Sequence, residues 1–118
     1  MDPIELYVHP TCTSCRKAQA WLDERGLGYE RRDYFRDRFT REELTGVLAS
    51  ARLTPRDVLS KRARAYRELV GDRALTDDQL IDLMIQEPTL LRRPLVISGH
   101  EAVIGFDRTG LERMIPGP

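Results

Sequence analysis

Two cysteines at a predicted turn from a strand to a helix constrain this chain more than any other feature. Cys12 and Cys15 are the only cysteines among its 118 residues. The alternating apolar segment Ile4–Val8 predicts a β-strand, and the pattern that begins at Thr13 predicts a helix. The fold must therefore lead a strand into a helix through a tight turn and place two thiols at the start of that helix.

Thiol–disulfide chemistry follows from this position. A helix N-terminus stabilises negative charge, so we expect the Cys12 thiol to ionise near neutral pH. Cys15 lies within one helical turn of Cys12, which allows the two to form a disulfide. We predict that Cys12 attacks as a thiolate and that Cys15 resolves the adduct, giving a redox-active disulfide. The alternative, two small buried apolar side chains, stays open.

The composition excludes several classes of partner. The 19 basic and 19 acidic residues cancel, which leaves no global field for direct binding of nucleic acid or a membrane surface. No segment has the length of a transmembrane helix or the pattern of a signal peptide, so the expected location is the cytoplasm. A zinc site needs four ligands, and the chain adds only two histidines, His9 and His100, to its cysteines. We expect no metal and no bound cofactor.

The N-terminal third predicts the beginning of an α/β fold, and the length fits one domain over residues 1–118. A strand over residues 4–8, a helix over 13–25 and a second strand over 29–34 predict a right-handed parallel crossover. The second strand is weakly patterned, which favours the edge of a sheet. Trp21 has helical spacing from other apolar residues and is expected in the core.

The middle of the chain is predicted to be a helical insertion of about residues 36–91. Thr40 and Thr76 each open a capping box before an apolar run, and Thr54 precedes a proline that suits the first position of a helix. Pro88 is expected to end the helix that follows Thr76. Each of these signals marks a helix boundary within the insertion.

The C-terminal part predicts a hairpin followed by a helix. Two short apolar runs, residues 95–97 and 102–104, flank a turn that contains Gly99. A last helix is expected over residues 109–115, with Pro116 after it. The order βαβ, helices, ββ, α predicts a thioredoxin-like fold with a helical insertion.

Arg93 and Pro94 precede the third predicted strand, a position that in a thioredoxin-like sheet lies beside the dithiol. Arg93 is a candidate to clamp an oxyanion or to pair with the Cys12 thiolate. Arg16, directly after Cys15, adds positive charge nearby. Ordinary surface arginines are the alternative for both.

Three further features have a functional and a plainer interpretation. His9 is a candidate to stabilise the thiolate as an imidazolium, or it is a solvated histidine at a strand end. A basic cluster can meet an acidic partner or an oxyanion, or it forms a solvated helical face. The cluster consists of Arg52, Arg56, Lys61, Arg62, Arg64 and Arg67.

Three motifs resemble the Spx/ArsC family, in register over essentially the whole chain. They are Pro-Thr-Cys-Thr-Ser-Cys-Arg-Lys-Ala at residues 10–18, Thr-Asp-Asp-Gln-Leu-Ile at 76–81, and Leu-Leu-Arg-Arg-Pro-Leu-Val-Ile at 90–97. The resemblance implies a thioredoxin-like fold with a helical insertion, a cis peptide bond at Pro94, and Cys12 as the reactive thiol.

The family contains arsenate reductases, in which the first cysteine attacks the oxyanion and three arginines hold it. The resemblance implies glutathione, glutaredoxin or thioredoxin as the reductant. Arg93 matches one of the three arginines, whereas the others correspond to Ser60 and Phe106. Lys61, next to Ser60, is a candidate substitute. Because each charged hydrogen bond contributes roughly 1.5–3 kcal/mol, we expect arsenate to bind less well here.

The family also contains Spx regulators, which use the Cys-x-x-Cys pair as a disulfide switch and bind the α subunit of RNA polymerase. The motif around Cys12 and the Gly105-Phe106 pair resemble this branch more closely. Thr54 replaces the glycine of the polymerase contact, and the chain lacks the longer Spx tail. We therefore predict an arsenate-reductase-like oxidoreductase acting on a small oxyanion or thiol substrate, with a redox-switched transcription regulator as the alternative.

Overall fold

The computed structural model describes residues 2–115, and its contacts divide the chain into two compact units. The first contains the residues up to Asp37 together with those from Arg93 onward, and the second contains Arg38–Arg92. Each unit is described by itself. The assignment of the whole chain to one domain stays a prediction, and Pro116 lies outside the described residues.

The first unit contains a four-stranded mixed sheet in the order β2-β1-β3-β4. Its strands are β1 (Ile4–Val8), β2 (Glu30–Asp33), β3 (Leu95–Ser98) and β4 (Glu101–Ile104). β1 pairs with β2 in parallel and with β3 in antiparallel orientation, and β3 pairs with β4 in antiparallel orientation. The parallel crossover and the edge position of the second strand are thereby confirmed.

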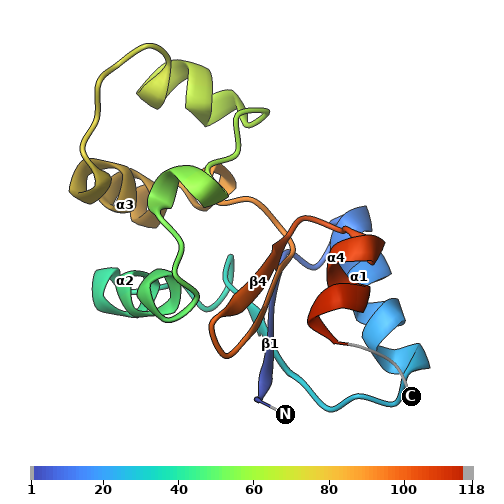
Figure 1. Ribbon diagram of the computed structural model, residues 1–118. Helices are drawn as coiled ribbons and strands as arrows, with labels where there is room; N and C mark the ends of the chain where they lie inside the picture. Colours follow the sequence, from blue (N-terminus) through green and yellow to red (C-terminus); the bar gives the residue numbers. More distant parts are fainter. Residues whose placement is uncertain (1, 116–118) are drawn as a thin grey trace. The chain divides into compact units, whose positions relative to one another are not determined.

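Two helices, α1 (Thr13–Glu24) and α4 (Arg108–Met114), complete the first unit (Figure 1). Their apolar side chains form one core with the inward-facing side chains of the sheet, because alternate residues of a strand point to the same face. This core contains Ile4, Leu6, Val8, Ala18, Trp21, Leu22, Val96, Val103 and Leu111. The predicted core position of Trp21 is confirmed.

The predicted ends of both helices were wrong by one residue. α1 ends at Glu24, since the chain turns at Arg25 and enters Gly26 with φ of 64°. α4 begins one residue earlier than expected, with Asp107 at its N-cap. The hairpin turn is shorter than the sequence suggested: Gly99, with φ of 62°, and His100 connect β3 to β4. A two-residue hairpin turn favours glycine for this reason.

The second unit is built from short helices. They are α2 (Arg41–Ser50), the 3-10 helix η1 (Pro55–Val58), the π-helix η2 (Tyr66–Val70), α3 (Asp77–Gln86) and the 3-10 helix η3 (Pro88–Leu90). The capping boxes at Thr40 and Thr76 are formed as predicted. The sequence did not predict η2, and Pro88 begins η3 rather than only ending α3. No described helix is both long and apolar enough to cross a membrane.

The C-terminal end of α2 has one residue in a left-handed conformation, Arg52, with φ of 57°. The N–H of Leu53 donates to the Leu48 carbonyl at 2.8 Å, and that of Arg52 donates to Ala49 at 3.1 Å. This is the Schellman arrangement, whose left-handed position favours glycine.

We predict that Arg52→Gly stabilises the protein by roughly 0.5–1 kcal/mol, because the lost left-handed strain exceeds the added freedom of the unfolded chain. Urea unfolding followed by circular dichroism measures this free energy. Ala49→Gly, in the right-handed part of α2, is the matched control and should destabilise. Equal destabilisation by both substitutions would contradict the prediction.

Candidate active site

Cys12 occupies the N-cap of α1 and thus joins the end of β1 to the helix. Its N–H donates to the His9 carbonyl at 3.2 Å, which closes the turn after β1. Its backbone is extended, with φ of −76° and ψ of 122°, and its sulfur accepts a hydrogen bond from the Cys15 N–H at 3.3 Å. The sulfur therefore takes the place that a serine or aspartate oxygen fills at most N-caps.

The surroundings of Cys12 favour its thiolate. Partial burial raises the pKa of the Cys12 thiol, but hydrogen bonds from the Cys15 thiol and backbone, together with the Arg93 guanidinium, outweigh burial and leave that pKa below its ordinary value. Because the Cys12 side chain is only partly buried, a substrate can still reach it.

Cys15 has the opposite character. It is 2% exposed, and burial, followed by the hydrogen bond with Cys12, raises the pKa of its thiol to about 12. Both thiols are in the reduced form in this structure. The surroundings thus favour the thiolate at Cys12 and the protonated thiol at Cys15. The roles of the two cysteines in attack and resolution stay predictions.

Arg93 is part of the candidate site and lies just before the first residue of β3. Its peptide bond with Pro94 is cis, as the family resemblance implied. The Pro94 carbonyl accepts a hydrogen bond from the Gly105 N–H at 2.8 Å, which ties this segment to the end of β4. The guanidinium carbon of Arg93 lies 5.4 Å from the centroid of the Phe35 ring, and its charge acts on Cys12.

The other predicted site residues have different positions. Arg16 is exposed, and its Nη2 donates to the Thr11 carbonyl at 3.2 Å, so it contacts the turn before Cys12. The Nδ1 atom of His9 lies 2.9 Å from the Thr11 hydroxyl. Lys61 is exposed and belongs to the second unit. The roles proposed for Arg16, His9 and Lys61 stay predictions.

Sequence reasoning missed Tyr34 and Phe35, which follow directly after β2. Parallel strands end at the same edge of a sheet, so the residues after β2 lie beside those after β1. The Phe35 ring contacts His9 with ring centroids 4.3 Å apart, and Tyr34 is 1% exposed. The predicted parallel pairing was the signal that could have drawn attention to these aromatic residues.

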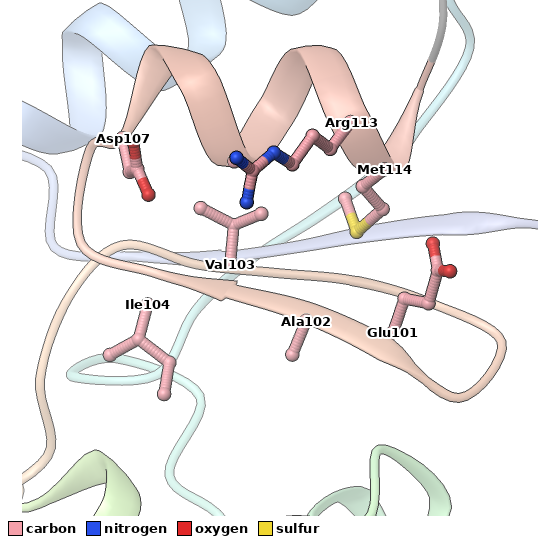
Figure 2. Close-up of a pocket in the computed structure, with 8 residues that line it drawn as sticks. Glu101, Ala102, Val103, Ile104, Asp107, Arg113 and Met114 are labelled. Carbon is pink, nitrogen blue, oxygen red and sulfur yellow. The ribbon is translucent and has the colours of Figure 1, made fainter.

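A separate hollow of about 440 Å³ lies between β4 and α4. Figure 2 shows the Arg113 side chain extending over Val103 in this hollow, with Met114 beside it. None of the predicted site residues lines it. Within residues 2–115, no group of three or more histidine, cysteine or acidic side chains is placed to hold a metal ion.

The sheet, the cis-proline and the dithiol at the start of α1 define a thioredoxin-like protein. A glutaredoxin from Archaeoglobus fulgidus shares this fold, with a TM-score of 0.51 at 15% identity over 99% of this chain and 89% of the other. Residues 7–114 match the sequence model of the ArsC family. The chain belongs to the ArsC family.

The proteins that are similar to this chain include some named as transcriptional regulators and others named as arsenate reductases. The global transcriptional regulator Spx of Listeria innocua is 32% identical over 96% of this chain and 87% of its own length. The Spx of Enterococcus faecalis is 33% identical over 96% and 86%. The structure of an arsenate reductase from Vibrio cholerae matches with a TM-score of 0.81 and 26% identity, covering 96% of each chain.

We predict that Arg93→Gln raises the pKa of Cys12, because the substitution removes a positive charge that favours the thiolate. Alkylation by iodoacetamide, followed by peptide mass spectrometry as a function of pH, measures this pKa. In the unmodified protein, reactivity should persist below the pKa of the same thiol in the unfolded chain and should be lost as the pH falls further.

Arg16→Gln is the matched control for this measurement, because it removes the same charge from the exposed position that contacts Thr11. We expect a smaller shift than for Arg93→Gln. Equal shifts would show that the general positive charge of the region, and not the guanidinium beside Cys12, governs the thiol.

Proposed function

We propose that this protein is a thiol–disulfide oxidoreductase of the arsenate-reductase-like kind, in which Cys12 attacks and Cys15 resolves. The observation that carries the proposal is the opposite character of the two thiols, with the pKa of Cys12 lowered and that of Cys15 raised. The lowered pKa makes the first thiol the better nucleophile of the two, since the thiolate is the reactive form.

The proposed reaction with a disulfide substrate has two steps. The Cys12 thiolate attacks one sulfur of the substrate, forms a mixed disulfide and releases the other sulfur as a thiolate that takes up a proton. Cys15 then loses its proton and attacks the Cys12 sulfur, which releases the second substrate thiol. The substrate gains two electrons, the Cys12–Cys15 pair loses two, and a thiol reductant such as glutathione, glutaredoxin or thioredoxin restores the dithiol.

The first step prepares the second. The raised pKa of Cys15 has burial as its largest cause, but the hydrogen bond with Cys12 and the negative charge of Cys12 also contribute. Both of these contributions vanish once Cys12 is part of a mixed disulfide. The pKa of Cys15 therefore falls at the stage when it must attack, which limits premature reaction of the second thiol.

For an oxyanion such as arsenate, the Cys12 thiolate would displace one arsenate oxygen as water and form a sulfur–arsenic bond. An external thiol would then attack the Cys12 sulfur, which forms a disulfide and releases arsenite, so that the two thiols together supply the two electrons. Arg93 supports this reading, because its guanidinium lies beside the nucleophile and can bind an anionic oxygen. The absence of arginine at positions 60 and 106 favours slow arsenate turnover. Arg16 and Lys61 are the proposed additional contacts to the substrate.

We predict that Cys12→Ser abolishes reduction of a glutathione-containing mixed disulfide, whereas Cys15→Ser blocks resolution and accumulates the Cys12–glutathione adduct. Intact-protein mass spectrometry after mixing with oxidised glutathione detects the adduct. The unmodified protein should instead lose two hydrogens as the internal disulfide forms. An adduct on Cys15 in the Cys12→Ser variant, formed at the rate of the unmodified protein, would refute the assignment of roles.

A second candidate function is a redox-switched transcription regulator that binds the α subunit of RNA polymerase. The observation that favours it is the similarity to proteins named Spx over 96% of the chain. In this case the Cys12–Cys15 disulfide would act as the switch, and no turnover would be needed.

Two assays separate these functions. Steady-state reduction of arsenate or a mixed disulfide, coupled to glutathione and glutaredoxin, should occur in the unmodified protein and be lost in Cys12→Ser if it is an enzyme. If it is a regulator, there should be no turnover, and the purified α subunit should bind with an affinity that differs between the reduced and the disulfide forms.

A further inference from the structure

His9 binds the turn that leads into Cys12 through both its side chain and its main chain. The Thr11 N–H donates to the Nδ1 atom of His9 at 3.2 Å, and the Cys12 N–H donates to the His9 carbonyl at 3.2 Å. Pro10, the remaining residue of the turn, has no N–H to donate. One residue therefore accepts every backbone donor of residues 10–12.

Thr11 is also bound from the side of the helix. Its carbonyl accepts a hydrogen bond from Nη2 of Arg16 at 3.2 Å, and the next residue, Cys12, is the N-cap of α1. Within residues 2–115, the acceptor that the structure gives the Thr11 N–H is the His9 ring. The His9 and Arg16 side chains thus hold the backbone directly ahead of Cys12, one through the N–H of Thr11 and the other through its carbonyl.

The hydrogen bond from the Thr11 N–H determines where the His9 ring carries its proton. A backbone N–H only donates, so Nδ1 presents its lone pair, and the proton of the neutral ring is on Nε2. The Thr11 hydroxyl, 2.9 Å from the same nitrogen, is compatible with this, because a hydroxyl both donates and accepts. An imidazolium has an N–H at both nitrogens, so protonation would set two donors against each other and break the contact.

The Phe35 ring keeps His9 in place. The two rings pack edge to face, with centroids 4.3 Å apart and an angle of 85° between their planes, an arrangement that aromatic pairs favour. The Arg93 guanidinium carbon lies 5.4 Å from the centroid of the same Phe35 ring, so this edge of the sheet already contains a positive charge. The Asp33 carboxylate accepts from the Phe35 N–H at 3.0 Å and lies 3.6 Å from Arg36, so it is engaged by groups other than His9.

We propose that His9 is a positioning residue, whose neutral ring accepts the Thr11 N–H and thereby holds the turn that places Cys12 at the start of α1. This inference rests on the proposed attack by Cys12. It assigns His9 the role of an uncharged acceptor in place of the imidazolium considered from the sequence. The positive side chain that favours the Cys12 thiolate is then Arg93.

The proton of His9 is located in the unmodified protein by long-range ¹H–¹⁵N NMR at neutral pH. The two ring nitrogens differ in their couplings to the ring protons, and a nitrogen without a proton resonates far downfield of one that carries it. We expect an unprotonated Nδ1 with a scalar coupling to the Thr11 amide nitrogen across the hydrogen bond. An imidazolium, a proton on Nδ1 or a missing coupling would overturn the proposal.

Two substitutions separate an acceptor from a charge at this position. His9→Asn keeps an acceptor, because an asparagine side chain accepts from the N–H two residues further on. His9→Phe keeps an aromatic ring for the contact with Phe35 and has no acceptor. The measured quantity is the rate of Cys12 alkylation by iodoacetamide at neutral pH, followed by peptide mass spectrometry.

We expect His9→Phe to be alkylated about two- to fivefold more slowly, in line with part of one hydrogen bond. A looser turn weakens the hydrogen bond from the Cys15 N–H to the Cys12 sulfur, so less of Cys12 is a thiolate. His9→Asn should recover most of the original rate. An equal loss in both variants would indicate a role of charge, and an unchanged rate in His9→Phe would indicate no role; either result would overturn the proposal.

Two control variants complete the experiment. His100→Asn removes the other of the two histidines, which assigns the NMR signals of His9. Because residue 100 lies between β3 and β4, at the end of β3 away from Arg93, the alkylation rate should not change. Thr11→Val removes the hydroxyl and keeps the N–H, so the proton position and the coupling should persist. A proton on Nδ1 in Thr11→Val would show that the hydroxyl fixes the ring and would overturn the proposal.

Failure of the proposed function gives a different result. If oxidised glutathione produces no Cys12–Cys15 disulfide in the unmodified protein, the oxidoreductase function is wrong. The NMR measurement and the alkylation rates still decide in that case whether His9 holds the turn ahead of Cys12.

Discussion

The hydrogen bond from the Cys15 N–H to the Cys12 sulfur is the interaction on which the rest of the site depends. It makes Cys12, the proposed nucleophile, part of the helix boundary, so the same contact ends the turn after β1, begins α1 and favours the Cys12 thiolate. The second cysteine follows within one turn of the helix and is buried by the core that α1 forms with the sheet. The same hydrogen bond therefore contributes both to the start of α1 and to the reactivity of the Cys12 thiol.

The parallel pairing of β1 and β2 completes the site. It brings the residues after β2 to the edge where Cys12 lies. The antiparallel neighbour β3 begins at the same edge, so Arg93, which precedes β3, also lies there. Three segments that are distant in the sequence meet there: residues 9–15, residues 34–35 and Arg93. The sheet thus determines which groups surround the thiol, and the start of α1 together with Arg93 favours its thiolate.

Belonging to the ArsC family narrows the chemistry but not the physiological role, because its relatives include both Spx regulators and arsenate reductases. The dithiol serves either role. What distinguishes them is the anion-binding capacity around Cys12, to which Arg93 contributes from the first unit, and the surface offered to a protein partner. The proposed role of Arg93 concerns thiolate formation, which both functions require.

The sequence by itself determined the features that depend on neighbouring residues: the strand and helix that flank Cys12, the capping boxes at Thr40 and Thr76, and the hairpin around Gly99. Helix ends shifted by a residue, and η2 went unpredicted because a π-helix has no distinctive local pattern. The Phe35 ring and the Arg93 guanidinium carbon, 5.4 Å apart, belong to residues that are far apart in the chain, and only the order of strands in the sheet brings them together. The tertiary structure alone therefore decided how the charge beside Cys12 is held.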